Sequence, residues 1–385
     1  MRFLELATDP ALVEIGQKVV AGERLSFEDG VALMSTRDVL TVGALADWKR
    51  RQVVGDDVYF TNNINMNPTN ICVARCKLCA FGVPFGTEGT FTLTHDQVRE
   101  KARYAAAHGI QECHVVGGLN PLLKLDYFTT FLDIIREEHP QAYVQGFTSV
   151  EIDYIAQREK TDTITILKEL RAAGLHALPG GGAEVLNDRI HKEMCDHKTG
   201  WRDWLRIHEE AHGLGMKTNA TMLYGHMETA EERVDHMLKL RDLQDRTGGF
   251  KAFIGLAFHP KNTAYEGVLK GPTGHDSLLV HAVGRLMIDN FPHIKMLWTY
   301  HGKKLTSVAL SWGVDDVGGS NYDELIIHAA GNKTVRGLPK DELVEIIEKA
   351  GRNPVLTNSG YWGTRWEPER SLARPRAEGP AAAVR

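Results

Sequence analysis

The hydrophobic and polar positions from about residue 59 onward repeat one unit: a short apolar run, a glycine-rich or polar loop, and an amphipathic helix. The helix from about Ile164 to Ala173 has an apolar stripe at helical spacing and stops at Gly174. Helix starts are also marked, since Thr94 and Gln97 have the spacing of a capping box. The apolar runs predict strands at Tyr59–Met66, Glu112–Val116, Ala142–Phe147, His176–Pro179, Lys217–Met222, Ala252–Phe258, Lys295–Thr299 and Thr306–Trp312.

The alternation of strands and helices predicts an α/β fold with a parallel sheet, because helical crossovers join parallel strands. A closed (β/α)8 barrel of the TIM type accommodates all the strand candidates. An open barrel of six units with a C-terminal extension fits the same pattern if the last two candidates are not strands. A chain of 385 residues is long for one domain, but such barrels commonly reach this size.

Segments outside the repeat flank the barrel at both ends of the sequence. Three segments before the barrel have helical patterns: Pro10–Ala21, a segment opened by Ser26, and Thr36–Arg50. We expect these helices to pack across one end of the barrel. The Arg-, Pro- and Ala-rich end has the composition of a disordered tail. The predicted organisation is a helical extension at 1–55, the barrel at 56–335, a C-terminal helix and extension packed on the barrel at 336–368, and the tail at 369–385.

Polar or glycine-rich segments follow most of the predicted strands. In barrels of this type, reactive groups lie at the carboxyl ends of the strands. We therefore expect the functional site where these segments meet. They are the cysteine-containing loop after the first strand, Gly117–Pro121, Thr148–Glu151, Pro179–Glu184, Tyr224–Glu228 and Phe258–Asn262.

Three cysteines stand close together in the loop after the first strand. Cys72, Cys76 and Cys79 have CxxxCxxC spacing, and the other two of the five cysteines are distant in the sequence. Structural zinc takes four protein ligands, and an ordinary [4Fe–4S] cluster takes four thiolates. Three thiolates on such a cluster leave one iron without a protein ligand, and that iron can bind a substrate directly. The spacing therefore predicts an open iron–sulfur site.

Two other interpretations of the cysteines remain open from the residues alone. One is a zinc site completed by His95 or another distant residue. The corresponding alternative to an enzyme is a zinc- or cluster-binding scaffold without turnover. A disulfide is less compatible with the sequence, since an odd number of cysteines leaves one thiol over. Cys113 precedes apolar residues and is expected in the core, and Cys195 has no partner at metal spacing.

Composition and charge exclude several classes of function. Hydrophobic residues make up 43% of the chain, enough for a large core, and no apolar run is long enough to span a membrane. A net charge of −5 with a pI near 6.4 provides no basic surface for nucleic acid or an anionic membrane. The first residues lack an apolar signal segment, so we expect a cytoplasmic protein. The patterns GxGxxG and GxxxxGK[ST], typical of dinucleotide and nucleoside triphosphate sites, are absent.

Glycines and histidines in the loops after the strands have both structural and functional interpretations. Gly117-Gly118 and Gly180–Gly182 could be simple turns, but beside a cysteine loop they favour close approach of the backbone to a ligand. Most of the 17 histidines are expected at the surface or in the core. His226 and His259 differ because they lie in the loops that follow strands. No HExxH pattern is present, which argues against a zinc hydrolase.

Taken together, the motifs resemble those of a known family. A CxxxCxxC loop after a first strand, with a glycine pair after the second, is similar to the radical S-adenosylmethionine (SAM) superfamily. More narrowly, the chain resembles the aminofutalosine synthases of menaquinone biosynthesis (the futalosine pathway) up to about Pro368. The matching segments are Ala21–Gly30, Met66–Cys72, Cys79–Phe81, Val150–Tyr154, Leu178–Glu184, Asn219–His226, Arg233–His236, Gln244-Asp245, Thr247–Phe250 and Ala257–Pro260.

The resemblance implies a reaction and its cofactors. In this family the 5′-deoxyadenosyl radical of SAM adds to the enol-ether double bond of 3-[(1-carboxyvinyl)oxy]benzoate, and rearrangement with release of bicarbonate gives 6-amino-6-deoxyfutalosine and methionine. One [4Fe–4S] cluster, SAM as co-substrate and a reducing flavodoxin- or ferredoxin-like donor are implied. The implied residues are Cys72, Cys76 and Cys79 as cluster ligands, Phe81, Gly117, Gly118, Glu151 and Asn219 at SAM, and His226, His259, Asn262 and Glu184 at the substrate.

Related enzymes with much of the same scaffold provide an alternative function. They are the dehypoxanthine futalosine cyclases and the enzymes that build the deazaflavin chromophore, in which Gln replaces the histidine of the motif Phe258–Pro260. The chain departs from the aminofutalosine synthase pattern at Gly82–Phe85, at Gly255 and at the end of Asp315–Ser320. These departures leave the three cysteines unchanged, and their expected effect is on the pocket that binds the substrate.

Overall fold

β1 (Asp57–Thr61) and β2 (Asn63–Asn65) are two halves of one strand, and this strand closes the sheet. β1 pairs in parallel with β9 (Asp316–Gly319), whereas β2 pairs in parallel with β3 (Glu112–Val115). The sheet therefore passes from β2 through β3 to β9 and returns to its starting strand at β1. The strands between are β4 (Tyr143–Gly146), β5 (Ala177–Leu178), β6 (Lys217–Tyr224), β7 (Phe250–Ala257) and β8 (His293–Lys295).

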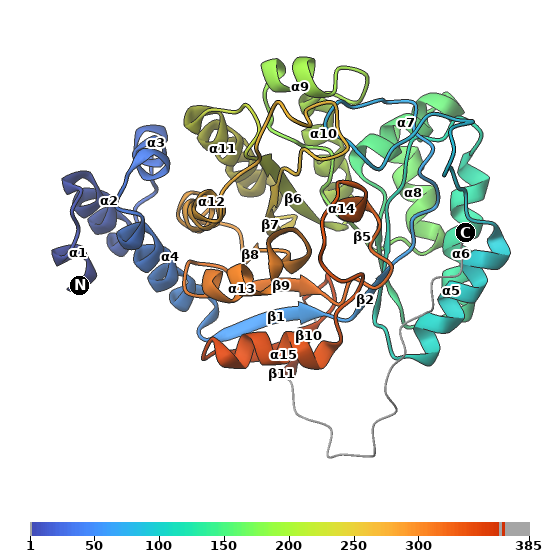
Figure 1. Ribbon diagram of the computed structural model, residues 1–385. Helices are drawn as coiled ribbons and strands as arrows, with labels where there is room; N and C mark the ends of the chain where they lie inside the picture. The colour runs from blue at the N-terminus through green and yellow to red at the C-terminus, as the bar shows by residue number, and fades with distance from the viewer. Residues whose placement is uncertain (1, 362–363, 366–385) are drawn as a thin grey trace.

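The computed structural model describes residues 2–361 and 364–365, and in it helices surround this ring of parallel strands (Figure 1). Counted with β1 and β2 as one strand, the ring has eight positions. The predicted (β/α)8 barrel is confirmed, and the open six-unit alternative does not apply. The helices that follow β2 in the chain are α5 (His95–Ala107), α6 (Leu125–Glu138), α7 (Ser149–Glu159), α8 (Thr163–Ala173), α9 (Asp188–Met194), α10 (Trp201–Gly213), α11 (Ala230–Thr247), α12 (Gly274–Met287), α13 (Trp298–Ala309), α14 (Ile326–Ala329) and α15 (Lys340–Lys349).

The strand predicted at Thr306–Trp312 is wrong, because that segment belongs to α13 and the turn after it. The eighth strand of the ring is β9, whose sequence Asp-Val-Gly-Gly contains a single branched apolar residue. Such a segment has low intrinsic strand preference, and its pairing with β1 and β8 decides its conformation. The seventh strand is displaced as well, since β8 ends at Lys295, where the prediction began.

The segment after α15 adds two strands that the sequence pattern did not predict. β10 (Asn353–Thr357) pairs in parallel with β1, and β11 (Thr364–Arg365) pairs antiparallel with β10. After β10, the Ser359 backbone amide and hydroxyl both donate to the Glu112 carboxylate, at 2.5 and 2.8 Å. Because Glu112 is the first residue of β3, this C-terminal segment lies at the amino end of the barrel.

The N-terminal helices form a layer outside the barrel (Figure 1). α3 and α4 pack against α11 and α12, and α4 also contacts Trp312 through the side of Gly43. The Arg241 guanidinium donates to Leu25 O at 3.0 Å and connects the two layers. This position on the side of the barrel differs from the expected position across one end. The extension comprises α1 (Arg2–Glu5), α2 (Pro10–Ala21), α3 (Phe27–Ser35) and α4 (Val39–Val54).

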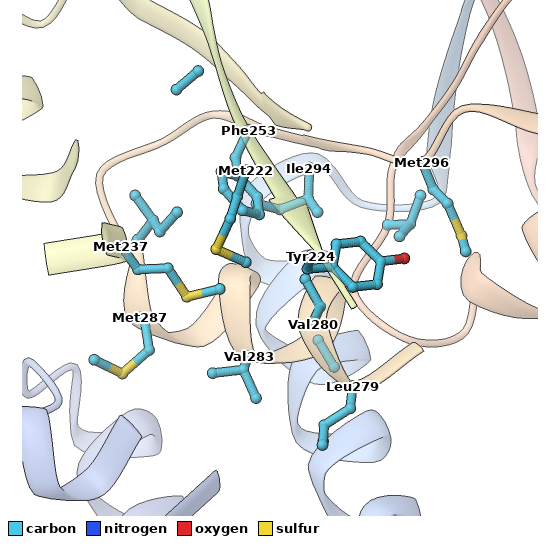
Figure 2. Close-up of a cluster of buried hydrophobic side chains, with 14 of the residues drawn as sticks. Met222, Tyr224, Met237, Phe253, Leu279, Val280, Val283, Met287, Ile294 and Met296 are labelled. Atoms are coloured by element: carbon cyan, nitrogen blue, oxygen red, sulfur yellow. The ribbon is translucent and has the colours of Figure 1, made fainter. Parts of the chain in front are cut away.

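Apolar side chains fill the space between the sheet and its helices rather than the barrel interior. Figure 2 shows one such cluster, in which Met222 and Phe253 from β6 and β7 meet Met237 of α11 and Val283 of α12. A second cluster joins β3 and β4 to α5, α6 and α8. In the part of the chain that the structure describes, no helix has both the length and the apolar character to cross a membrane.

Capping residues mark the helix starts as the sequence indicated. Thr94 and Gln97 form a reciprocal capping box at α5. Thr148 and Glu151 form another at the start of α7, directly after β4. The second of these boxes lies in one of the loops in which the sequence placed the functional site.

Candidate functional site

The three clustered cysteines lie on the long loop between β2 and α5, and backbone hydrogen bonds tie this loop to its surroundings. The Val73 amide donates to Leu119 O at 3.1 Å. The Lys77 amide donates to Met194 O, at the end of α9, at 2.9 Å. All three thiols are free and partly buried: Cys72, Cys76 and Cys79. The loop therefore holds three available thiols at the carboxyl end of the first barrel strand.

Gly82 lies between two of the thiols. Its backbone amide donates to Cys79 Sγ at 3.3 Å. A Cβ atom at Gly82 would come within 2.9 Å of Cys72 Cβ and 3.7 Å of Cys79 Sγ. Only glycine leaves room at this position. The glycine at residue 82, where the chain departs from the family pattern, therefore fits the close packing of the cysteine loop.

A cavity of about 430 Å³ opens beside Cys72. Its lining contains Cys72 together with apolar side chains, one arginine and one histidine. Phe85 in this lining is 66% exposed. The lining residues are Cys72, Val73, Arg75, Pro84, Phe85 and His197. The side of the cysteine loop at Cys72 is therefore open to the outside.

The glycine pair after β3 packs directly on the cysteine loop. The Gly118 amide donates to Thr69 O at 2.8 Å. A Cβ atom at Gly118 would lie 2.3 Å from Ile71 O, closer than real contacts come, and 3.1 Å from Cys72 Cβ, which is tight. The structure shows close approach of this backbone to the cysteine loop, and the expected contact of the pair with SAM stays a prediction.

Glu151 holds the other glycine of the pair. Its Oε1 accepts a hydrogen bond from the Gly117 amide at 2.9 Å, and its Oε2 accepts from the Thr148 amide and hydroxyl at 2.7 and 2.8 Å. Burial raises the pKa of Glu151 to about 7, while these hydrogen bonds act in the opposite direction. Glu151 therefore holds the Gly117 backbone in position beside the cysteine loop.

Glu184 forms a buried ion pair with Lys198, a residue that the sequence did not mark. Lys198 also donates to Gly182 O at 2.9 Å. Burial alone would lower the pKa of Lys198, but the Glu184 carboxylate and the thiols of Cys76 and Cys195 raise it. Burial alone would raise the pKa of Glu184, and Lys198 lowers it. The pair therefore stays charged within electrostatic reach of a cluster-loop thiol.

The two candidate histidines have different surroundings. His226 is bound by its own loop: its Nδ1 accepts from the Met227 amide at 2.7 Å, and its Nε2 faces Leu223 O at 3.0 Å. Its side chain is fully buried. His259 is half-buried, and its Nε2 faces Tyr300 O at 3.1 Å. Burial lowers the pKa of both imidazoles, so both are neutral near pH 7.

Three further candidates lie in separate places. Phe81 is buried in the cysteine loop with its ring edge toward Phe91. Asn262 is exposed, and its amide donates to Ala329 O at 2.7 Å. His95 stacks on Tyr127, with ring centroids 5.1 Å apart. Among residues 2–361 and 364–365, no three His, Cys, Asp or Glu side chains converge on one point as ligands of a single metal ion, which the zinc interpretation requires.

Polar side chains occupy the barrel interior, where branched aliphatic residues are usual. Asn219 Nδ2 on β6 donates to Gln145 Oε1 on β4 at 3.2 Å, across the short strand β5. Asn219 Oδ1 and Asn67 Oδ1 are buried without a hydrogen-bond partner. Buried polar atoms normally have partners, so these two amides are suited to receive groups of a bound molecule.

A [4Fe–4S] cluster held by three thiolates fits these residues. The three free thiols share one loop, two of them lie on either side of Gly82, and Cys72 lines the cavity. Burial raises the pKa of Cys76 to about 12 and also raises that of Cys79. The thiols of Cys76 and Cys79 are therefore protonated without metal, and binding of iron must displace these protons.

Two family models match this chain. The Radical SAM superfamily matches residues 66–240, and the CofH/MqnC C-terminal region matches residues 247–370. An aminodeoxyfutalosine synthase of Thermus thermophilus is 42% identical over 93% of this chain and 98% of that protein. One of Streptomyces coelicolor is 38% identical over 90% and 92%.

Relatives with another name are also similar. A 5-amino-6-(D-ribitylamino)uracil–L-tyrosine 4-hydroxyphenyl transferase of Methanoculleus marisnigri is 38% identical over 89% of this chain and 95% of that protein. Among solved structures, methylornithine synthase has a TM-score of 0.72 at 16% identity, covering 90% of this chain and 98% of that one. The hydrogenase maturase HydG has a TM-score of 0.71 at 16% identity, covering 93% and 78%. At these identities the two structures support the fold alone.

Proposed function

Because the chain belongs to the radical SAM superfamily, in the family that includes the aminodeoxyfutalosine synthases, we propose that it is itself such a synthase. It is an enzyme of the transferase type. The proposed reaction joins the 5′-deoxyadenosyl group of SAM to 3-[(1-carboxyvinyl)oxy]benzoate, with rearrangement and release of bicarbonate, and yields 6-amino-6-deoxyfutalosine and methionine. The similarity to two aminodeoxyfutalosine synthases over nine-tenths of the chain carries this proposal.

The cluster ligands in this proposal are the thiolates of Cys72, Cys76 and Cys79. When bound, a reduced [4Fe–4S] cluster with one open iron supplies the electron that cleaves SAM. The backbone of Gly117 and Gly118, fixed by Glu151 and Thr69, forms the wall beside the cysteine loop against which SAM binds. Phe81 lies near the adenine, and Asn219 offers the unpaired oxygen Oδ1 to it from the barrel interior.

The Glu184–Lys198 pair matches the methionyl end of SAM. Its two charges are opposite, as are those of the amino and carboxylate groups of an amino acid. Its position beside Cys76 supports binding at the open iron, where those two groups attach. Glu184, expected at the substrate, is therefore assigned to SAM, whereas His259 stays the candidate for the substrate. His226 supports the loop that faces it.

The electron donor in this proposal is a flavodoxin- or ferredoxin-like protein, and the site of action is the cytoplasm. The open side of the cysteine loop at Cys72 supports access of a protein donor.

The tyrosine-dependent transferases are the second candidate, because relatives of that name are up to 38% identical to this chain. The two functions differ in substrate. The reconstituted, reduced protein should be offered SAM labelled in the adenosyl group with either the enolpyruvyl benzoate or tyrosine plus the aminouracil. We expect the label in an adduct with the benzoate, and one methionine per product.

Two results would contradict the proposed synthase activity. Label found mainly as 5′-deoxyadenosine in the presence of the enolpyruvyl benzoate, with no adduct by mass, would exclude the synthase. Product from tyrosine and the aminouracil under the same conditions would establish the second candidate instead. A Cys76→Ala protein treated identically is the blank for both reactions.

A further inference from the structure

Lys251 crosses the barrel interior with most of its hydrogen-bonding capacity unused. It is the second residue of β7 and only 5% exposed. Its ammonium group donates to Gln145 Oε1 on β4 at 3.0 Å and lies 5.7 Å from the centre of the Tyr143 ring. An ammonium carries three donors, and the structure assigns an acceptor to one of them. A buried cation in this state is suited to bind an anion.

The neighbouring amide supplies a second unsatisfied group. Gln145 Oε1 accepts from both Lys251 Nζ and Asn219 Nδ2. Asn219 Oδ1 is buried and has no partner. Lys251 and Asn219 thus meet at Gln145. Because Asn219 Oδ1 is an acceptor, Lys251 is the group here that donates to an anion.

The buried acids nearby are already occupied. Glu112 accepts two hydrogen bonds from Ser359. Asp316 accepts from the Tyr361 hydroxyl at 2.8 Å and lies 3.1 Å from Lys295 Nζ. Neither acid is a hydrogen-bond partner of Lys251 here, although both attract its charge from a distance. The charged, titratable and aromatic groups around Lys251 are Glu112 and His114 on β3, Tyr143 on β4, Lys295 on β8 and Asp316 on β9.

The position of Lys251 Nζ beside Gln145 is deep enough in the barrel to meet the ring carboxylate of the proposed substrate. His114 pairs with Gln145 in the sheet, and Gly117 lies three residues further along the same chain segment. At a rise of about 3.3 Å per residue, the Gln145 layer lies roughly 10 Å below the glycine wall. The enol ether must react beside the cysteine loop, so a ring carboxylate meta to it points down toward this layer.

We propose that Lys251 binds the ring carboxylate of an aromatic acid substrate inside the barrel. This assignment rests on the proposed function and adds to it a specificity-determining residue on β7. The assignment gives the buried Lys251 ammonium group, which has one hydrogen-bond acceptor in the protein, a second acceptor in the substrate. Burial and the charge of Lys295 also lower the pKa of Lys251 to about 7, and a carboxylate placed between the two lysines would raise it again.

Binding to the reconstituted, unreduced protein tests the assignment without turnover. The ligands are 3-[(1-carboxyvinyl)oxy]benzoate and the analogue that lacks the ring carboxylate, (1-carboxyvinyl)oxybenzene. The proteins are wild type, Lys251→Gln, and Lys217→Gln as a control, since Lys217 lies at the start of the adjacent strand but is exposed. Titration calorimetry gives the Kd of each pair.

We expect wild type and Lys217→Gln to lose at least roughly tenfold in affinity when the ring carboxylate is removed, as for a charge-assisted hydrogen bond. Lys251→Gln should bind the benzoate about tenfold more weakly than wild type and should bind both ligands similarly. Equal weakening of both ligands by Lys251→Gln, or unchanged affinity for the benzoate, overturns the assignment.

A second readout uses wild type alone and covers the case in which Lys251→Gln does not fold. At pH 8 in buffers of different ionisation enthalpy, binding of the benzoate should take up close to one proton, and binding of the analogue much less. Equal proton uptake for the two ligands overturns the assignment. Absence of benzoate binding to wild type would instead remove the proposed function on which the assignment rests.

Discussion

The buried carboxylate of Glu151 accepts a hydrogen bond from the backbone amide of Gly117 at 2.9 Å. Glu151 begins α7, and Gly117 follows β3, so this contact joins two loops at the carboxyl end of the barrel. It makes the position of the glycine wall depend on a side chain that does not itself face the thiols.

Glu151→Gln should weaken SAM binding roughly tenfold and leave the iron content unchanged. An amide oxygen accepts as the carboxylate does, but the amide NH2 faces a backbone donor at Gly117 or Thr148 and loses that bond, at a cost of about 1–3 kcal/mol. Equilibrium binding of SAM to the reconstituted protein measures the effect. Glu159→Gln is the matched control, because Glu159 lies on the same helix and accepts from Leu125 in an exposed position.

Glu151 should also make stability depend on pH. Its pKa is raised from 4.5 to about 7, so the folded protein binds the proton more tightly than the unfolded chain. The contribution to folding is full below about pH 4.5 and is lost as pH rises toward 7, by about 3 kcal/mol. Urea unfolding of the iron-free protein at pH 5 and pH 7.5 should show a smaller fall for Glu151→Gln than for wild type. Parallel pH dependence in the two proteins would contradict the assignment.

Replacement of Cys72, Cys76 or Cys79 by Ala should abolish turnover and the visible absorption that bleaches with dithionite. Two thiolates cannot hold the cluster with one iron open for SAM. Cys113→Ala and Cys195→Ala should keep both properties. Cys195 is the sharper control, because its thiol lies within electrostatic reach of Cys76. Iron loss in the Cys113→Ala/Cys195→Ala double variant would show that the ligands are assigned wrongly.

Gly118→Ala should lower iron content and SAM binding together. The new Cβ would overlap the Ile71 carbonyl oxygen at 2.3 Å, so the cysteine loop must move, at a cost of roughly 1–3 kcal/mol. Gly213→Ala is the control, since nothing lies within 4 Å of a Cβ there. Iron analysis and SAM binding on the same preparations would decide the matter. Loss of SAM binding with full iron content would place the added methyl group against SAM rather than against the loop.

Lys198→Met should destabilise the protein by about 3–5 kcal/mol, because it leaves the Glu184 carboxylate buried without its partner. The double variant Lys198→Met/Glu184→Leu should recover much of this loss, since two apolar side chains replace the pair. Neither variant should bind SAM as wild type does. Denaturant unfolding of the iron-free proteins gives the stabilities. Equal stability of the single and double variants would mean that the two charges are not coupled.

Local patterns in the sequence determined the cysteine loop, the repeated strand–helix unit and the capping boxes. Spacing is sufficient for these features, because clustered thiols such as Cys72, Cys76 and Cys79 and helix caps such as Thr94 with Gln97 involve residues only a few positions apart. The parallel barrel followed from the alternation of elements. The same reasoning failed at β9, whose glycines and aspartate have no strand pattern of their own.

Only the tertiary structure decided which distant residues meet. Lys198 comes beside Cys76 because the loop before α10 folds back over the cysteine loop, and Lys251 reaches Gln145 because the barrel closes. Charged residues such as these look like ordinary surface residues in the sequence. Their burial follows from contacts between segments far apart in the chain, which the sequence pattern does not reveal.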